Sequence, residues 1–70
     1  MKVQSKHSTR VRVSPRVGIK TEYSTRPGVT YDVERTTSNS LGDWYYLTHD
    51  TAPIGWAKKD SNGVENFRDI

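Results

Sequence analysis

Among the two histidines and eight carboxylates of this 70-residue chain, four are the candidates for acid–base catalysis or metal binding: His7, Asp43, His49 and Asp50. Their spacing supports neither role, because the chain has no His-x-x-x-His or Glu-x-x-His pair that would place two ligands together. It also has no cysteine, which excludes disulfides and thiolate metal sites. We therefore expect no metal site and no cofactor.

Nucleophilic catalysis also lacks support in the sequence. Serines and threonines are abundant, but none has a Gly-x-Ser-x-Gly context and no suitable base accompanies them. Asp50 follows His49 in a run of turn-forming residues, where an aspartate commonly bonds its own backbone. We interpret the chain as non-catalytic.

The aromatic side chains offer binding chemistry instead. Both tryptophans and two of the four tyrosines lie in the segment Asp43–Lys58, D-W-Y-Y-L-T-H-D-T-A-P-I-G-W-A-K. Trp and Tyr give large, rigid contact surfaces and carry one polar group each. In a strand, alternation places Trp44 and Tyr46 on one face, with Tyr45 and Leu47 on the other.

We predict that the contact surface consists of Trp44, Tyr46 and Trp56, lining an outer groove, while Leu47 and Ala57 belong to the core. The alternative interpretation is that both tryptophans cap the core, because a small domain needs bulky core residues. The sequence leaves both interpretations open.

Further candidates surround this surface. Tyr23 precedes a Pro-Gly loop and is expected to reach the groove, whereas Tyr31 alternates with valines and is expected in the core. Four basic side chains are candidates for pairing with phosphates or carboxylates of a polymer: Arg16, Arg26, Lys58 and Lys59. For each of the four, a solvated surface charge is the simpler interpretation.

Strands must position these side chains, because no segment shows a helical period. Thr9–Val13 alternates strictly, which predicts a first strand with Val11 and Val13 facing inward. The later predicted segments are an extended stretch at Val17–Tyr23, a strand at Val29–Arg35 with its valines and Tyr31 on one side, and a hairpin of Trp44–Thr48 and Ile54–Ala57. The predicted turns and loops are Ser24–Gly28 with a type II turn at Pro27-Gly28, a distal loop at Thr36–Gly42, and a turn at Ser61–Gly63 before Val64–Ile70.

Composition limits the architecture to one small domain. Hydrophobic residues make up 31% of the chain and the mean hydropathy is −0.87, but the clustered aromatics and alternating segments argue against disorder. Met1–Ser8 is polar and aperiodic, so we expect a disordered leader or linker there and a single domain over residues 9–70. The fold class is predicted as all-β, a small, partly open β-barrel of about five strands.

Charge and hydropathy constrain the partners. The net charge of +3, from eleven basic and eight acidic residues, favours weak attraction to polyanions such as nucleic acid or anionic wall polymers. No apolar run reaches membrane-spanning length, and no signal-peptide core follows Met1-Lys2-Val3-Gln4. We expect no membrane insertion. The chain is then either an internal protein or a module of a longer exported one.

The succession V-T-Y-D-V, a polar loop, G-D-W-Y-Y-L, a short turn and I-G-W-A resembles the bacterial Src-homology-3 (SH3) family, including its Gly-Trp cell-wall modules. The resemblance covers roughly Thr21–Asp60, with Thr9–Val13 as an opening strand, while the family's Asn-x-Arg-x-Gly-Pro opening is absent. The matching residues are Tyr31, Val33, Gly42, Trp44, Tyr45, Leu47, Gly55, Trp56 and Ala57.

This resemblance implies an SH3-like barrel that binds peptidoglycan or teichoic acid of the bacterial cell wall. Such modules sit beside a peptidoglycan hydrolase, as in an autolysin or phage lysin, or on a surface protein. The expected location is therefore extracellular or in the cell wall, within a larger exported or phage-encoded protein, and the expected state is a monomer.

Two other functions remain open. Small β-barrels bind single-stranded nucleic acid on aromatic platforms within basic grooves, which the charge balance permits. Recognition of proline-rich peptides ranks third, because the signalling members of the superfamily use an acidic loop and Thr36–Gly42 has no carboxylate.

Overall fold

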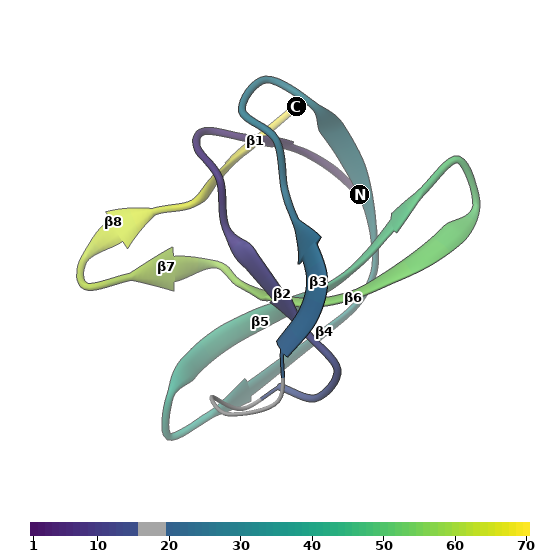
Figure 1. The fold of residues 1–70 in the computed structure, drawn as a ribbon. Coiled ribbons are helices and arrows are strands. Elements are labelled where there is room, and N and C mark those ends of the chain that lie inside the picture. The colour runs from purple at the N-terminus through teal and green to yellow at the C-terminus, as the bar shows by residue number, and fades with distance from the viewer. Residues whose placement is uncertain (16–19) are drawn as a thin grey trace.

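Strands dominate the computed structural model, which describes residues 1–15 and 20–70 and contains no helix within them. Seven strands form one curled antiparallel sheet in the order β3-β2-β6-β5-β4-β1-β9, and β7 and β8 form a separate hairpin (Figure 1). The bounds are β1 Lys2–Ser5, β2 Arg10–Arg12, β3 Lys20–Ser24, β4 Thr30–Asn39, β5 Gly42–His49, β6 Ala52–Lys58, β7 Asp60–Ser61, β8 Val64–Glu65 and β9 Phe67–Asp69. The all-β prediction is confirmed, but the strands outnumber the predicted five. The described residues contain no helix long and apolar enough to span a membrane.

The central pair of strands, β4 and β5, carries a β-bulge. Val33 is the partner of Leu47, and Arg35 is the partner of Tyr46, so Glu34 is the extra residue on β4. A bulge bends its strand and increases the local right-handed twist. It also shifts the two-residue alternation, so Arg35 lies on the face opposite to that of Val33.

A second bulge lies between β5 and β6. Leu47 is the partner of Gly55, and Thr48 is the partner of Pro53, which leaves Ile54 as the extra residue. Ile54 packs against the core although simple alternation from Gly55 would turn it outward. The two bulges curl the central strands around the inner face.

The inner face of the sheet holds the core. Its buried residues are Val3, Tyr31, Tyr45, Leu47, Ala57 and Phe67, with Tyr23, Val29, Val33 and Ile54 packed around them. The core positions predicted for Tyr31, Leu47 and Ala57 are confirmed. Phe67 comes from the C-terminal strand β9, which shows no periodicity in the sequence.

The disordered leader predicted for residues 1–8 is wrong. β1 lies between β4 and β9, Val3 and Ser5 are buried, and Lys6 N donates a hydrogen bond to Asn66 O at 2.9 Å. Four residues are too few for alternation to be visible in sequence. The strand is held by partners distant in the chain rather than by its own pattern.

Two local predictions also fail. Val13 is 57% exposed because β2 ends at Arg12, so of the two valines only Val11 faces inward. The predicted distal loop at Thr36–Gly42 is mostly strand, since β4 continues to Asn39 and β5 begins at Gly42. Of the extended stretch predicted at Val17–Tyr23, the structure describes β3, which begins at Lys20, while residues 16–19 lie outside the described residues.

The predicted turns are present. Val29 N donates to Arg26 O at 3.2 Å and Gly28 has φ of 84°, as a turn centred on Pro27-Gly28 requires. Asp50 and Thr51 both have positive φ, 50° and 67°, in the two-residue connection of the β5–β6 hairpin. Such a pair matches the right-handed twist of the flanking strands.

At Gly55 the backbones of β2 and β6 approach too closely for a side chain. A Cβ atom there would lie 2.8 Å from Val11 Cγ1 and 2.9 Å from Arg12 O, and Gly55 has φ of 135°. This contact places the Val11 side chain against Gly55 and sets the backbone position of Arg12, the last residue of β2. The single β2–β6 partner pair, Arg12 and Trp56, is adjacent to it.

We predict that Gly55→Ala lowers the free energy of unfolding by about 2–4 kcal/mol, because it adds a backbone clash to an unfavourable φ. Gly63→Ala is the matched control, since Gly63 has φ of 78° but nothing within 4 Å of the position that an added methyl group would take. The control should lose only about 1 kcal/mol. Urea unfolding followed by tryptophan fluorescence measures both, and equal losses would contradict the proposed close contact.

Candidate functional site

A row of cationic and aromatic residues crosses the outer face of the sheet. Cα pairing links Arg35 on β4 to Tyr46 on β5, Tyr46 to Trp56 on β6, and Trp56 to Arg12 on β2. Tyr45, the neighbour of Tyr46, belongs to the core, so the row lies on the opposite face. We call Arg35, Tyr46, Trp56 and Arg12 the outer row.

The rings of the outer row contact one another directly. The Tyr46 and Trp56 centroids lie 5.2 Å apart at 70°, an edge-to-face arrangement. The Arg35 guanidinium carbon lies 4.7 Å from the Tyr46 centroid and 5.7 Å from that of Trp56. Both rings are only partly buried and the Arg35 side chain is 62% exposed, so the row is accessible. An exposed cation–π contact of this kind is worth about 0.5–1 kcal/mol.

Trp44, by contrast, is fully buried, so its prediction as an exposed contact is wrong. Its Nε1 donates a hydrogen bond to Asn39 Oδ1 at 3.1 Å, and the Lys58 ammonium lies 5.9 Å from its ring. The indole therefore has neither open surface nor a free donor for a ligand. The alternative interpretation, burial, applies to Trp44, whereas Trp56 remains accessible beside Tyr46 as predicted.

Tyr23 and Arg26 meet at a different place, a pocket of about 300 Å³ lined by Tyr23, Arg26, Val29, Tyr31 and His49. The hydroxyl groups of Tyr23 and Tyr31 lie 2.8 Å apart, and Arg26 N donates to the Tyr31 hydroxyl at 3.1 Å. No residue of the outer row lines this pocket. The prediction that Tyr23 reaches the groove of the tryptophans is therefore wrong, and the candidate Arg26 lies beside Tyr23 rather than beside the outer row.

Burial raises the pKa of the Tyr23 phenol to about 12, and its hydrogen bond with the Tyr31 hydroxyl contributes to that rise, against an opposing effect of Arg26. Burial also raises the pKa of the core residue Tyr45. Both phenols therefore lose their proton at a higher pH than a free tyrosine does.

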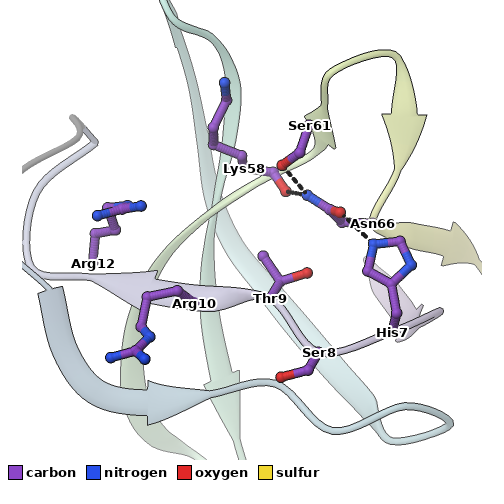
Figure 2. A pocket seen from close by; sticks show the side chains of 8 residues that line it. All are labelled: His7, Ser8, Thr9, Arg10, Arg12, Lys58, Ser61 and Asn66. Atoms are coloured by element: carbon purple, nitrogen blue, oxygen red, sulfur yellow. Dashed lines mark hydrogen bonds between the residues drawn. The ribbon is translucent and has the colours of Figure 1, made fainter.

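A further pocket lies between β2 and the β6–β7 segment, and we call it the β2–β6 pocket (Figure 2). Its volume is about 300 Å³, and its lining residues are His7, Ser8, Thr9, Arg10, Arg12, Lys58, Ser61 and Asn66. Asn66 Nδ2 donates to Lys58 O and to Ser61 Oγ, each at 2.9 Å, and Asn66 Oδ1 lies 2.6 Å from His7 Nε2. The Asn66 side-chain amide thus links its own segment to the β6–β7 segment and to the segment of His7.

Two residues that line the β2–β6 pocket each carry a buried polar atom that the described residues leave unpaired. Thr9 Oγ1 and Arg12 Nη1 are buried and have no hydrogen-bond partner. Leaving a buried polar group unpaired costs roughly 1–3 kcal/mol, so such atoms call for a physical explanation. Arg12 belongs both to this pocket and to the outer row.

The remaining predicted residues are dispersed. Lys58 contributes to the β2–β6 pocket while its ammonium lies near Trp44, and Lys59 lies apart, in a shallow hollow with Asp43. Arg16 lies outside the described residues. The structure thus brings together Tyr46 with Trp56, and Tyr23 with Arg26, but not the predicted set as a whole.

The titratable residues considered for catalysis do not converge either. His7 and His49 line different pockets, and Asp43 accepts a hydrogen bond from Ser38 Oγ at 2.5 Å. Asp50 is exposed, with Oδ2 4.0 Å from His49 Nε2. Across residues 1–15 and 20–70, no group of three His, Asp or Glu side chains is arranged to hold a metal ion.

Sequence reasoning missed Arg12 and Arg35. Arg35 continues the parity of Tyr31 and Val33, which strict alternation would turn into the core. Because a charged residue such as Arg35 is not expected in the core, its inward parity was the one signal in the sequence for a bulge at Glu34. Arg12 stood within the predicted first strand, on the face opposite to Val11, but nothing in the sequence indicated that its strand adjoins Trp56.

Comparison of the chain with protein-family models, with curated proteins and with solved structures found no match. Function is therefore inferred from the residues of this chain and their geometry.

We predict that Trp44→Ala destabilises the fold by about 3–5 kcal/mol, because it empties a fully buried site. Trp56→Ala should cost less, roughly 1–2 kcal/mol, because the ring is partly exposed. Chemical denaturation of the two variants compares them, with the remaining tryptophan as the fluorescent probe. Equal losses would contradict the assignment of one buried and one accessible indole.

We also predict that the stability conferred by Tyr23 is pH-dependent. Its folded pKa of about 12 lies above the unfolded value of 10.0, so its contribution is complete below pH 10 and is lost as the pH rises towards 12. Tyr23→Phe should make the fall in the free energy of unfolding between pH 10 and 12 shallower. Parallel curves for the two proteins would refute the prediction.

Proposed function

We propose that this chain is a non-catalytic module of the bacterial SH3 type that binds a polymer of the bacterial cell wall through the outer row. The observation that carries the proposal is the row itself. Two accessible aromatic rings lie side by side on adjacent strands, with Arg35 contacting them and Arg12 paired to Trp56. A sheet that buries its other face in a core holds these groups rigidly.

The shape of the outer row favours an extended ligand. It runs across four neighbouring strands and lies on an outer face, whereas small-molecule sites are concave and enclose most of the ligand. Aromatic rings offer apolar area to the faces of sugar rings, and guanidinium groups pair with carboxylates or phosphates. Peptidoglycan and teichoic acid combine these two kinds of chemistry along one chain.

The SH3-like architecture is part of the same proposal. It is supported by the curled antiparallel sheet and by the β5–β6 hairpin, in which G-D-W-Y-Y-L pairs with I-G-W-A. In this proposal the module acts at the cell envelope as part of a larger exported or phage-encoded protein. The hydrolytic or surface function then belongs to another domain.

One observation favours a second candidate, single-stranded nucleic acid. A guanidinium group beside an aromatic pair, as Arg35 lies beside Tyr46 and Trp56, also suits the stacking of bases. Binding of this kind weakens steeply with added salt, since it releases counterions. An oligonucleotide titrated at two salt concentrations separates the candidates.

We predict that Trp56→Ala lowers binding to purified Gram-positive sacculi about tenfold or more, because it removes the larger ring of the row. Arg35→Gln should lower it about threefold, since it removes an exposed cation from the rings. A co-sedimentation assay at several protein concentrations gives the apparent affinities.

Arg68→Gln on β9 is the charge-matched control and should bind as the parent does, because Arg68 is exposed and lies outside the row. Circular dichroism of each variant verifies that it is folded. Unchanged binding by a folded Trp56→Ala and by Arg35→Gln would rule out the outer row as the contact surface.

A further inference from the structure

The β7–β8 hairpin stands apart from the rest of the fold. Its strands form a sheet of their own, in which Asp60 pairs with Glu65 and Ser61 with Val64, and it projects from the side of the main sheet (Figure 1). No residue of the hairpin belongs to the described core, and the Asp60–Glu65 pair places two carboxylates opposite each other, which is destabilising. A two-stranded hairpin of this kind is marginally stable in water, so it opens locally at a low cost in free energy.

Asn62 and Gly63 form the turn of this hairpin. Their φ angles are 51° and 78°, and positive φ at both central residues is what a type I′ turn requires. Both residues are exposed, and an atom placed at the Cβ position of Gly63 would have nothing within 4 Å. The turn is therefore open to solvent, and Gly63 places no side chain beside its own backbone nitrogen.

The side-chain amide of Asn62 differs from those of the other two asparagines. The Asn39 amide takes part in three hydrogen bonds, and so does the Asn66 amide, which is only 2% exposed. The Asn62 amide has no hydrogen-bond partner within residues 1–15 and 20–70. Asn39 is followed by a serine and Asn66 by a phenylalanine, whereas Asn62 is followed by glycine. Of the three amides, only that of Asn62 is free to turn towards the next backbone nitrogen.

We propose that Asn62 is a site of spontaneous deamidation and that the reaction releases the β7–β8 hairpin while the main sheet stays folded. When the hairpin opens, the backbone nitrogen of Gly63 attacks Asn62 Cγ. A Cγ–N bond forms, the Cγ–Nδ2 bond breaks, and ammonia leaves with the proton of the attacking nitrogen. Water then adds to a carbonyl carbon of the cyclic imide and opens the ring, so the sequence needs no oxidant or reductant.

The ring opens to two different products. Addition of water at Cγ gives aspartate, which leaves the length of the main chain unchanged. Addition at the main-chain carbonyl carbon of Asn62 breaks its bond to the Gly63 nitrogen and gives isoaspartate, in which the main chain runs through the side-chain carbons. The turn then contains an additional backbone atom. Because a two-residue turn fixes the register of its strands, the isoaspartate form cannot keep the Ser61–Val64 pair.

Loss of that pair also affects the β2–β6 pocket. Ser61 Oγ accepts a hydrogen bond from Asn66 Nδ2 at 2.9 Å, so this wall of the pocket depends on the position of β7 (Figure 2). Either product lowers the net charge of +3 by one and adds a third carboxylate to a hairpin that already carries Asp60 and Glu65. The core residues lie on other strands, so the main sheet is retained.

The first test locates the reaction. The purified chain is kept in heavy-oxygen water at mildly alkaline pH, then digested and mapped by mass spectrometry. The peptide that contains Asn62 should gain one heavy oxygen and give two chromatographic forms. Conversion should be about tenfold or more faster there than at Asn39 or Asn66. A synthetic peptide of residues 60–65 measures the rate without the fold, and conversion of that peptide with none at Asn62 of the folded chain would overturn the proposal.

Gly63→Ala tests the attacking atom. The added methyl group hinders the Gly63 nitrogen, although the positive φ of this position makes the turn of the variant less stable. Deamidation should therefore slow about tenfold even though the hairpin opens more readily. An unchanged or faster rate in the variant would refute attack by this nitrogen.

The second test measures release of the hairpin. Ion-exchange chromatography isolates the converted chain, because each conversion adds one negative charge, and amide hydrogen exchange is then followed by NMR. In the isoaspartate form the paired amides of β7 and β8 should exchange about tenfold or more faster, while those of β5 keep their protection. Retained protection of the hairpin, or loss of protection in β5, would overturn the proposed release.

Asn62→Asp is the matched control for charge. It adds the same negative charge as isoaspartate without an additional backbone atom, and aspartate tolerates the left-handed conformation of this position. The variant should therefore keep the hairpin amides protected to within about threefold of the parent. A loss of protection equal to that of the isoaspartate form would refute backbone insertion as the cause of release.

Discussion

The close approach of β2 and β6 at Gly55 is the contact on which the rest of the surface depends. It lets Val11 enter the interior and brings Arg12 opposite Trp56, although β2 and β6 share only that one partner pair. The three-residue strand β2 thereby forms one wall of the β2–β6 pocket, and its last residue, Arg12, ends the outer row. A residue with no side chain therefore determines where Arg12 lies.

The two bulges distribute side chains between core and solvent. In a pleated sheet one extra residue reverses the faces of everything beyond it. The Glu34 bulge turns Arg35 out to meet Tyr46, and the Ile54 bulge turns Ile54 in while leaving Trp56 out. The sheet thereby combines tight curvature with a continuous aromatic and cationic outer surface.

The sequence was sufficient for features that depend on neighbours in the chain. The β5–β6 hairpin, the turns at Pro27-Gly28 and Asn62-Gly63, and the placement of Tyr46 beside Trp56 on the outer face followed from alternation and turn chemistry. It was insufficient where distant segments decide the outcome. β1 looked disordered because its partners are β4 and β9, and Trp44 looked accessible because nothing local indicated its bond to Asn39 or the proximity of Lys58. Arg12 became a candidate only through its distant partner Trp56.

The link between His7 and Asn66 has a consequence for how the protein is made. The two residues are 59 positions apart, and the adjoining ladder pairs β1 with β9. Contacts of such long sequence separation pay their loop-closure entropy before they gain energy, so they form late. During synthesis the edge of β1 that pairs with β9 stays unpaired until β9 has emerged from the ribosome. A nascent chain that already has its central hairpin therefore still lacks the wall of the β2–β6 pocket that Asn66 contributes.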